Sequence, residues 1–359
     1  MRLPLKILRV LKGEQKPPFY FFPLYLPACL YSIIVRIRAR LYQCGMLKTR
    51  RLPCKVISIG NLAAGGTGKT PFTIYLCGLL KDKGFKPAVV IRGYKGASEG
   101  STCVVSDGKN ILMSPFDAGD EAVLLSRSLT GVPVVMGSNR YEAGILAVDR
   151  FGADVVVLDD GYQHLALQRD LNILLMDAAH PFGNGHTLPL GYLREPGSAA
   201  GRADIIVLTR CEGVDLKTPG LPTGVPVAMA AYRQSSIYDI YNNNVVAPGE
   251  LTGKCIMPVA AVADPASFSL IMNGLNAKIL KGKFYPDHHS YSHSDLTEIE
   301  AEATRDGADF ILVTEKDAVK LTTLRPSKLP ILAVAIQIQI VAGNDLLDNL
   351  VNNLSVGKG

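Results

Sequence analysis

The sequence lacks the cysteine arrangement of a zinc knuckle or of a disulfide framework. Its seven cysteines are an odd number and include no C-x-x-C pair. Zinc sites and disulfide-stabilised domains depend on such spacings or on paired cysteines. We therefore expect a protein of a reducing, cytoplasmic compartment. No internal repeat is visible either, which argues against a repeat architecture.

Acidic residues are nearly absent from the first 55 positions. Glu14 is the only acid there, against twelve lysines and arginines, although the whole chain of 359 residues carries a net charge of only +6. Such a modest overall charge is not typical of nucleic-acid-binding proteins, so no nucleic acid is expected as a partner. The local excess of positive charge instead favours an anionic surface, such as a membrane surface.

The N-terminal part also lacks a long uninterrupted apolar run. Its most apolar stretch, residues 19–35, is 17 residues long and contains Pro23 and Pro27, so it is short and broken for a transmembrane helix. Residues 13–16 (Gly-Glu-Gln-Lys) interrupt the earlier apolar positions, and no small-residue cleavage site follows. A cleavable signal peptide is therefore not expected.

From Pro27 onward the apolar residues follow helical spacing. They recur every three or four positions, whereas polar residues occupy another face: Leu30, Ile33, Ile34, Ile37 and Leu41 against Ser32, Arg36 and Arg40. This pattern predicts an amphipathic helix that lies at a membrane interface. The alternative is a helix that packs on the soluble core while its arginines remain solvated.

What the chain does have is an apolar strand followed by a glycine-rich loop and a helix. The loop departs from the pattern G-x-x-x-x-G-K-[ST] only in having Ala63 at the first glycine position. Glycines let backbone N–H groups face phosphate oxygens, the lysine reaches the β- and γ-phosphates, and the threonine hydroxyl binds Mg²⁺. An ordinary glycine-rich turn is the alternative. The predicted nucleotide-binding residues are Gly65, Gly66, Thr67, Gly68, Lys69 and Thr70.

A second candidate element ends another apolar strand. Residues 155–158 (Val-Val-Val-Leu) are followed by Asp159 and Asp160. Carboxylates at a strand end can hold Mg²⁺ beside the phosphates of a nucleotide. A plain strand-ending turn would use the same residue types, but the phosphate loop favours the metal interpretation.

Short apolar runs alternate with helical stretches along the rest of the chain, which predicts an α/β fold with a mostly parallel sheet of the P-loop NTPase type, flanked by helices. Strands are expected at 87–92, 132–136, 154–158, 172–176 and 204–209, and again at 225–231, 256–263, 308–314 and 331–340. The proline- and glycine-rich stretch 216–224 is the expected boundary. We thus predict an N-terminal membrane-associating segment (1–50), a kinase core domain (51–222) and a smaller C-terminal α/β domain (223–359).

Several further clusters are dense in reactive residues. They occupy 118–121 (Ala-Gly-Asp-Glu), 161–164 (Gly-Tyr-Gln-His), 188–196, 284–291 and 314–321. Together with the loop at 60–71, these clusters resemble the tetraacyldisaccharide 4′-kinase family, the lipid A 4′-kinases of Gram-negative bacteria. The resemblance runs from about residue 20 to about residue 340.

The resemblance implies transfer of the γ-phosphoryl group of ATP to the 4′-hydroxyl of a tetraacylated glucosamine disaccharide 1-phosphate. The reaction would take place at the cytoplasmic face of the inner membrane, with Mg²⁺ as the metal. The family's carboxylate–imidazole pair falls on Asp120 and His288, and Arg194 would neutralise charge on the transferred group. The implied catalytic residues are Asp120, His288, Lys69 and Arg194, and the implied metal residues are Thr70, Asp159, Asp160 and Glu195.

Some residues near these motifs have simpler explanations. His289 and His293 can be surface residues of a polar loop, and His164 can line the site or complete a turn. Two other functions remain open at this stage: another P-loop kinase or GTPase with a soluble substrate, and a nucleotide-dependent switch at a membrane. Phosphorylation of a lipid acceptor separates them, because a switch needs no acceptor. No oligomeric partner is predicted.

Overall fold

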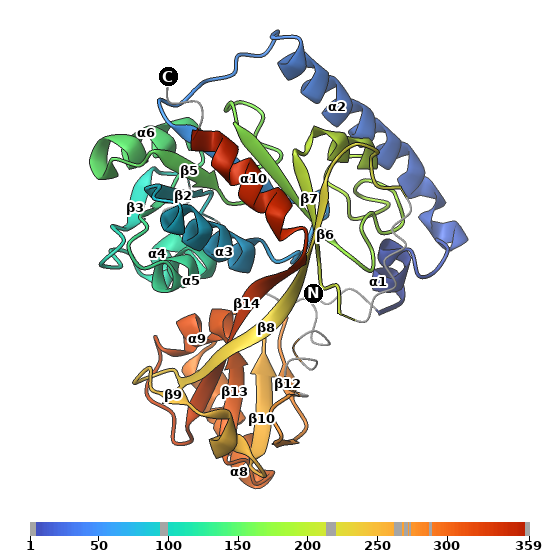
Figure 1. Ribbon diagram of the computed structural model, residues 1–359. Coiled ribbons are helices and arrows are strands. Elements are labelled where there is room, and N and C mark those ends of the chain that lie inside the picture. The colour runs from blue at the N-terminus through green and yellow to red at the C-terminus, as the bar shows by residue number, and fades with distance from the viewer. Residues whose placement is uncertain are drawn as a thin grey trace.

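The computed structural model describes residues 5–93, 100–212, 220–261, 268, 272, 274–286 and 289–355. Within these residues the strands form one 14-stranded sheet, with the order β11-β10-β13-β14-β8-β7-β6-β1-β5-β2-β4-β3 along its main path. Figure 1 shows that the sheet passes through two lobes, which are joined by the long strands β8 and β14. The predicted α/β fold with a mostly parallel sheet is confirmed.

The large lobe contains the parallel part of the sheet around β1. Its strands are β1 (Lys55–Gly60), β2 (Pro87–Ile91), β4 (Val134–Met136), β5 (Val155–Leu158), β6 (Leu171–Asp177) and β7 (Ile205–Thr209), with β3 (Cys103–Ser106) antiparallel at the edge. All four residues of β5 are buried, because helices cover both faces of the sheet. This is why these strands are continuous apolar runs in the sequence.

Helices cover the two faces of the large lobe unequally. On one face α3 (Lys69–Asp82) and α5 (Asp120–Ser128) pack against Val155 and Val157. On the other, α6 (Arg140–Phe151) packs against Val156. The short helices α4 (Pro115–Ala118) and η2 (Gly197–Arg202) complete this lobe.

A two-stranded antiparallel ribbon leads from the large lobe into the small one (Figure 1). It is formed by β8 (Val227–Asp239) and β14 (Ile331–Ala342), which pair from Met229 with Ala342 to Asp239 with Leu332. The first residues of β8 also pair in parallel with β7. The ribbon therefore belongs to both lobes.

The small lobe is a second α/β layer around β10, β13 and β14. Besides β14 it contains β9 (Val245–Val246), η3 (Pro248–Leu251), β10 (Cys255–Ala260), β11 (Lys278–Ile279), β12 (Lys283–Phe284), α8 (His293–Arg305), β13 (Phe310–Thr314) and α9 (Glu315–Leu321). Leu296 and Ile299 of α8 pack against Val313 and Ile331. Ser292 caps α8, because its side chain accepts a hydrogen bond from the backbone N–H of Asp295.

The C-terminal helix returns to the large lobe. Helix α10 (Asn344–Ser355) places Leu347 and Val351 in the same core as Leu76 of α3, and Ile338 of β14 joins them. The division into 1–50, 51–222 and 223–359 therefore stays a prediction about independent domains. Within the predicted segment 223–359, the end of β14 and all of α10 pack with the large lobe.

The N-terminal segment forms α1 (Leu5–Lys12), η1 (Phe19–Leu24) and α2 (Tyr25–Gln43). Helix α2 runs along the outside of the large lobe (Figure 1). One side of it docks, since Ala28 packs with Phe21 and Leu190. The 25-residue stretch from Phe19 to Gln43 is long and apolar enough to cross a membrane by length and composition, and only 11% of its most apolar window is buried.

Candidate active site

The phosphate loop follows β1 and ends where α3 begins. Asn61 organises it, because its side-chain amide donates to the backbone oxygen of Gly65 at 3.2 Å and to the hydroxyl of Thr67 at 2.9 Å. Gly68 precedes the helix with φ 83°, and a Cβ atom there would clash with the hydroxyl of Tyr232. Glycine is thus required both by the backbone and by a neighbour. The N-terminus of α3 opens on the loop, as phosphate binding requires.

Two cations converge on Asp160 beside this loop. Lys69 Nζ lies 3.6 Å from Asp160 Oδ1, and Arg194 Nη1 lies 3.0 and 2.8 Å from the two carboxylate oxygens. Burial opposes ionisation here, but the charges of Lys69 and Arg194 prevail and hold the pKa of Asp160 below its usual range. Its backbone has φ 54°, a left-handed conformation that is uncommon for a non-glycine residue. The site therefore holds an ionised carboxylate between two cations.

The neighbouring Asp159 has a different environment. It is buried, and the hydroxyl of Thr73 donates to its Oδ1 at 3.3 Å. Burial raises the pKa of Asp159 to about 6, although the charge of Lys69 acts in the opposite direction. The pKa values of these two consecutive acids thus shift in opposite directions, because only Asp160 is directly paired with cations.

The oxygen atoms near the loop suit Mg²⁺. Thr70, Asp159 and Asp160 line the same cleft, and Mg²⁺ prefers such hard oxygen ligands together with water and phosphate oxygens. In the described part of the chain no group of three or more His, Cys, Asp or Glu side chains could hold a metal ion by itself. A magnesium ion bound here would therefore depend on the nucleotide for much of its coordination.

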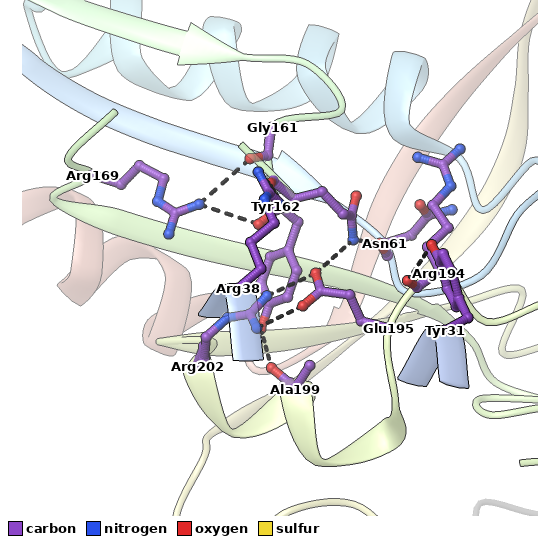
Figure 2. A network of polar contacts seen from close by, with 11 residues as sticks. Tyr31, Arg38, Asn61, Gly161, Tyr162, Arg169, Arg194, Glu195, Ala199 and Arg202 are labelled. Carbon is purple, nitrogen blue, oxygen red and sulfur yellow. Dashed lines mark hydrogen bonds and ion pairs between the residues drawn. The ribbon is translucent and has the colours of Figure 1, made fainter. Parts of the chain in front are cut away.

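Glu195 is engaged by other side chains. Arg202 donates to both carboxylate oxygens, at 2.7 and 2.8 Å, and Gln163 Nε2 donates to Oε1 at 3.1 Å (Figure 2). The same amide group of Gln163 donates to the backbone oxygen of Asn61 at 2.9 Å. Glu195 is thus paired with a bidentate guanidinium, and its metal role stays a prediction. The contacts also link Glu195, through Gln163, to the start of the phosphate loop.

Asp120 begins α5 and faces the small lobe. Its Oδ2 lies 3.2 Å from Nζ of Lys320, in α9. The proposed partner, His288, lies outside the described residues, so the Asp120–His288 pair stays a prediction. His289 stacks on Tyr285 at 4.4 Å and its Nε2 lies 3.3 Å from Asp295 Oδ2.

One large cleft lies between the lobes, with a volume of about 3350 Å³. The large lobe contributes the phosphate loop, the strand-end acids and Arg194, whereas the small lobe contributes Tyr285 and Lys320. Helix α2 also reaches this cleft with Tyr31 and Arg38. The cleft can therefore bring a nucleotide and a second molecule together.

A sequence profile of the tetraacyldisaccharide-1-P 4′-kinase family matches residues 21–355. The chain belongs to this family. It is 47% identical over 298 residues to a tetraacyldisaccharide 4′-kinase of Pelobacter propionicus, covering 82% of both chains. It is 42% identical over 316 residues to the one from Geobacter sulfurreducens, covering 88% of both. The crystal structure of the "apo" form of LpxK from Aquifex aeolicus in complex with ATP is 32% identical, with a TM-score of 0.79 over 94% of this chain and 99% of that one.

In this member of the tetraacyldisaccharide 4′-kinase family, sequence reasoning missed Arg210, directly after β7. Its Nη2 donates to the backbone oxygen of Gly66 at 2.9 Å, and its Nη1 lies 2.9 Å from Asp177 Oδ2. Its backbone has φ 61°, so the position is strained for a non-glycine residue. No local sequence pattern predicts that Arg210 contacts the phosphate loop.

His164 also lines the cleft of this family member. Burial lowers the pKa of His164 to about 4, and the charges of Arg140, Arg169, Arg38 and Arg92 act in the same direction. Its imidazole is therefore neutral at pH 7. The arginines come from separate parts of the chain, which is why spacing alone left the role of His164 open.

Helix α2 is bonded directly to the loops of the site (Figure 2). Tyr31 donates from its hydroxyl to the backbone oxygen of Arg194 at 3.0 Å, and Arg38 donates to the backbone oxygen of Gln163 at 3.3 Å. The N-terminal segment is thus part of the site's framework in this kinase.

Proposed function

We propose that this chain transfers the γ-phosphoryl group of ATP to the 4′-hydroxyl of a tetraacylated glucosamine disaccharide 1-phosphate, in lipid A biosynthesis. Membership of the tetraacyldisaccharide 4′-kinase family supports this activity. The observation that carries it is one cleft that both the phosphate loop and Asp120 line. The structurally similar LpxK from Aquifex aeolicus, solved in complex with ATP, supports ATP as the nucleotide.

The large lobe binds and neutralises the phosphates. Backbone N–H groups of residues 65–70 and the ammonium group of Lys69 hold the β- and γ-phosphates. Arg194 stabilises the charge that builds on the transferred group, as its position beside Asp160 allows. Thr70, Asp159 and Asp160 would hold Mg²⁺, which supplies further neutralisation of phosphate charge when bound.

The acceptor hydroxyl meets Asp120. As the bond between the γ-phosphorus and the ADP oxygen breaks, a new bond forms to the 4′-oxygen, and the hydroxyl proton passes to a base. We assign that role to Asp120 together with His288, the imidazole holding or relaying the proton. Glu195 takes a positioning role through Gln163 in place of metal coordination.

The outer face of α2 is suited to a lipid substrate. Leu26, Leu30, Ile34 and Ile37 are all more than half exposed, and the basic residues of the segment favour anionic lipid headgroups. We propose that this face associates with the cytoplasmic surface of the inner membrane. The bonds from Tyr31 and Arg38 to loops of the site support a cleft that opens beside that surface.

The decisive experiment follows γ-labelled ATP in detergent micelles that contain the tetraacyl disaccharide 1-phosphate. We expect label on the lipid with the parent protein, and a loss of at least about 10³-fold with Lys69→Ala. Lys55→Ala is the matched control, because Lys55 lies at the opposite end of β1 and pairs with Asp170. Phosphate release without lipid labelling, or release that needs no acceptor, would instead favour a hydrolytic switch.

A further inference from the structure

Lys320 joins the two lobes at the point where the acceptor is expected. It lies near the end of α9, in the small lobe, and its Nζ is 3.2 Å from Oδ2 of Asp120 in the large lobe. The same ammonium group donates to the backbone oxygen of His289 at 2.9 Å. His289 directly follows His288 in the sequence. Lys320 thus contacts both chain segments that carry the proposed proton-handling residues.

The ammonium group of Lys320 is buried and held by specific partners. Its side chain is only 8% exposed, and a buried ammonium group is costly unless it is paired. Asp317, which is fully buried, also faces this ammonium group: its Oδ1 lies 4.0 Å from Nζ, while its Oδ2 accepts from the backbone N–H of Ala261 at 3.0 Å and from the hydroxyl of Thr314 at 2.7 Å. The shorter contact of Lys320 is therefore the one to Asp120, across the cleft.

A neighbouring pair provides an internal comparison. Lys316, one turn earlier in α9, lies 3.3 Å from Glu121, the residue after Asp120. The carboxylate of Glu121 is 52% exposed, whereas that of Asp120 is 21% exposed. Ion pairs exposed to water contribute little. The two lysines bridge the same helices, but only Lys320 does so out of solvent and on a catalytic carboxylate.

We propose that Lys320 is a positioning residue for phosphoryl transfer, one that orients the Asp120 carboxylate and ties the backbone of His289 in the small lobe to it. Oδ2 of Asp120 is held by the ammonium group, which leaves Oδ1 to face the acceptor hydroxyl. Lys320 itself touches neither reactant. This inference rests on the proposed function, because it gives Asp120 the role of base.

The test is a double-mutant cycle with the lipid-labelling assay. We expect Lys320→Met to lower kcat about 10- to 30-fold while the KM for ATP changes less than about threefold, because only the geometry of the proton transfer is lost. In an Asp120→Asn background the same substitution should change kcat less than about twofold, since the two residues act as one unit. Lys316→Met, the matched control, should stay within about threefold of the parent.

Each result has a definite consequence. If Asp120→Asn is strongly impaired but Lys320→Met stays within about threefold of the parent, the inference is overturned and the proposed function stands. It is equally overturned if the two losses multiply, because Lys320 would then act elsewhere. If Asp120→Asn itself keeps full turnover, both the base assignment and the inference fail. Should Lys320→Met not fold, as judged by its thermal midpoint, Lys320→Gln is measured against the same criteria.

Discussion

The two lobes contribute to the cleft in different ways. The large lobe supplies its groups in contiguous runs: the loop at 65–70 between β1 and α3, the acids at 159–160 after β5, and the pair at 194–195 in the loop before η2. The small lobe supplies side chains from segments that are far apart in the sequence, such as Tyr285 and Lys320. Phosphate binding needs a backbone shape that only a local motif can make. Orienting an acceptor needs side chains that the tertiary fold brings together.

Among the tests of this comparison, the substitution with the largest expected effect is at His288, the predicted partner of Asp120. We expect His288→Ala to lower turnover at least about 10²-fold with much smaller effects on ATP affinity, because general acid–base groups typically contribute that much. His289→Ala is the matched control, since its ring packs on Tyr285 and pairs with Asp295. Turnover within about threefold of the parent would remove His288 from the mechanism.

A second test asks which acids of the large lobe serve the metal. Asp160→Asn should raise the Mg²⁺ concentration for half-maximal activity at least about tenfold, because it removes a hard anionic oxygen beside the phosphate loop. Glu195→Gln should shift it less than about threefold, since Arg202 already occupies that carboxylate. The free energy of unfolding should instead fall by about 3 kcal/mol, the cost of breaking a buried pair. A large magnesium shift for Glu195→Gln would restore its metal role.

A third test asks whether the exposed face of α2, and not the surface of the large lobe, binds membranes. Ile34→Glu places a charge on an α2 side chain that is 55% exposed. We expect recovery with anionic vesicles to fall about tenfold, with ATP binding unchanged, because an apolar anchor is lost. Ile111→Glu makes the same change at an exposed isoleucine of the large lobe and should sediment as the parent does. Equal sedimentation of all three proteins would contradict the membrane assignment of α2.

The sequence predicted the strands of the large lobe well because each is a buried apolar run between turn residues. Expected strands at 154–158 and 204–209 became Val155–Leu158 and Ile205–Thr209. The pairing of β8 with β14 was not foreseen, since the partners lie about a hundred residues apart and no local pattern specifies pairing across that distance.

The same reasoning explains what was missed in the site. The phosphate loop and the acids after β5 were found because their chemistry is contiguous in the sequence. Lys320 and Arg210 were not recognised, because their roles depend on what the fold places next to them. The pairing of Glu195 with Arg202, seven residues later, was not foreseen either, and the predicted metal role of Glu195 stays a prediction.

His164 gives the smallest expected effect, and it tests whether tertiary neighbours also control chemistry within the large lobe. Its folded-state pKa is lowered to about 4, mainly by burial and then by Arg140 and other arginines. The unfolded chain, with a histidine pKa near 6.5, takes up this proton first as the pH falls. The contribution of neutral His164 to the free energy of unfolding is therefore fully present above about pH 6.5 and is lost as the pH falls toward 4. Because the ring is partly exposed to solvent, we expect a loss of only about 1 kcal/mol, measured as the difference in urea midpoints between pH 7 and pH 4.5. His164→Gln should abolish that part of the acid sensitivity. Identical pH dependence in the variant and the parent would show that burial and the nearby arginines do not lower the pKa of His164.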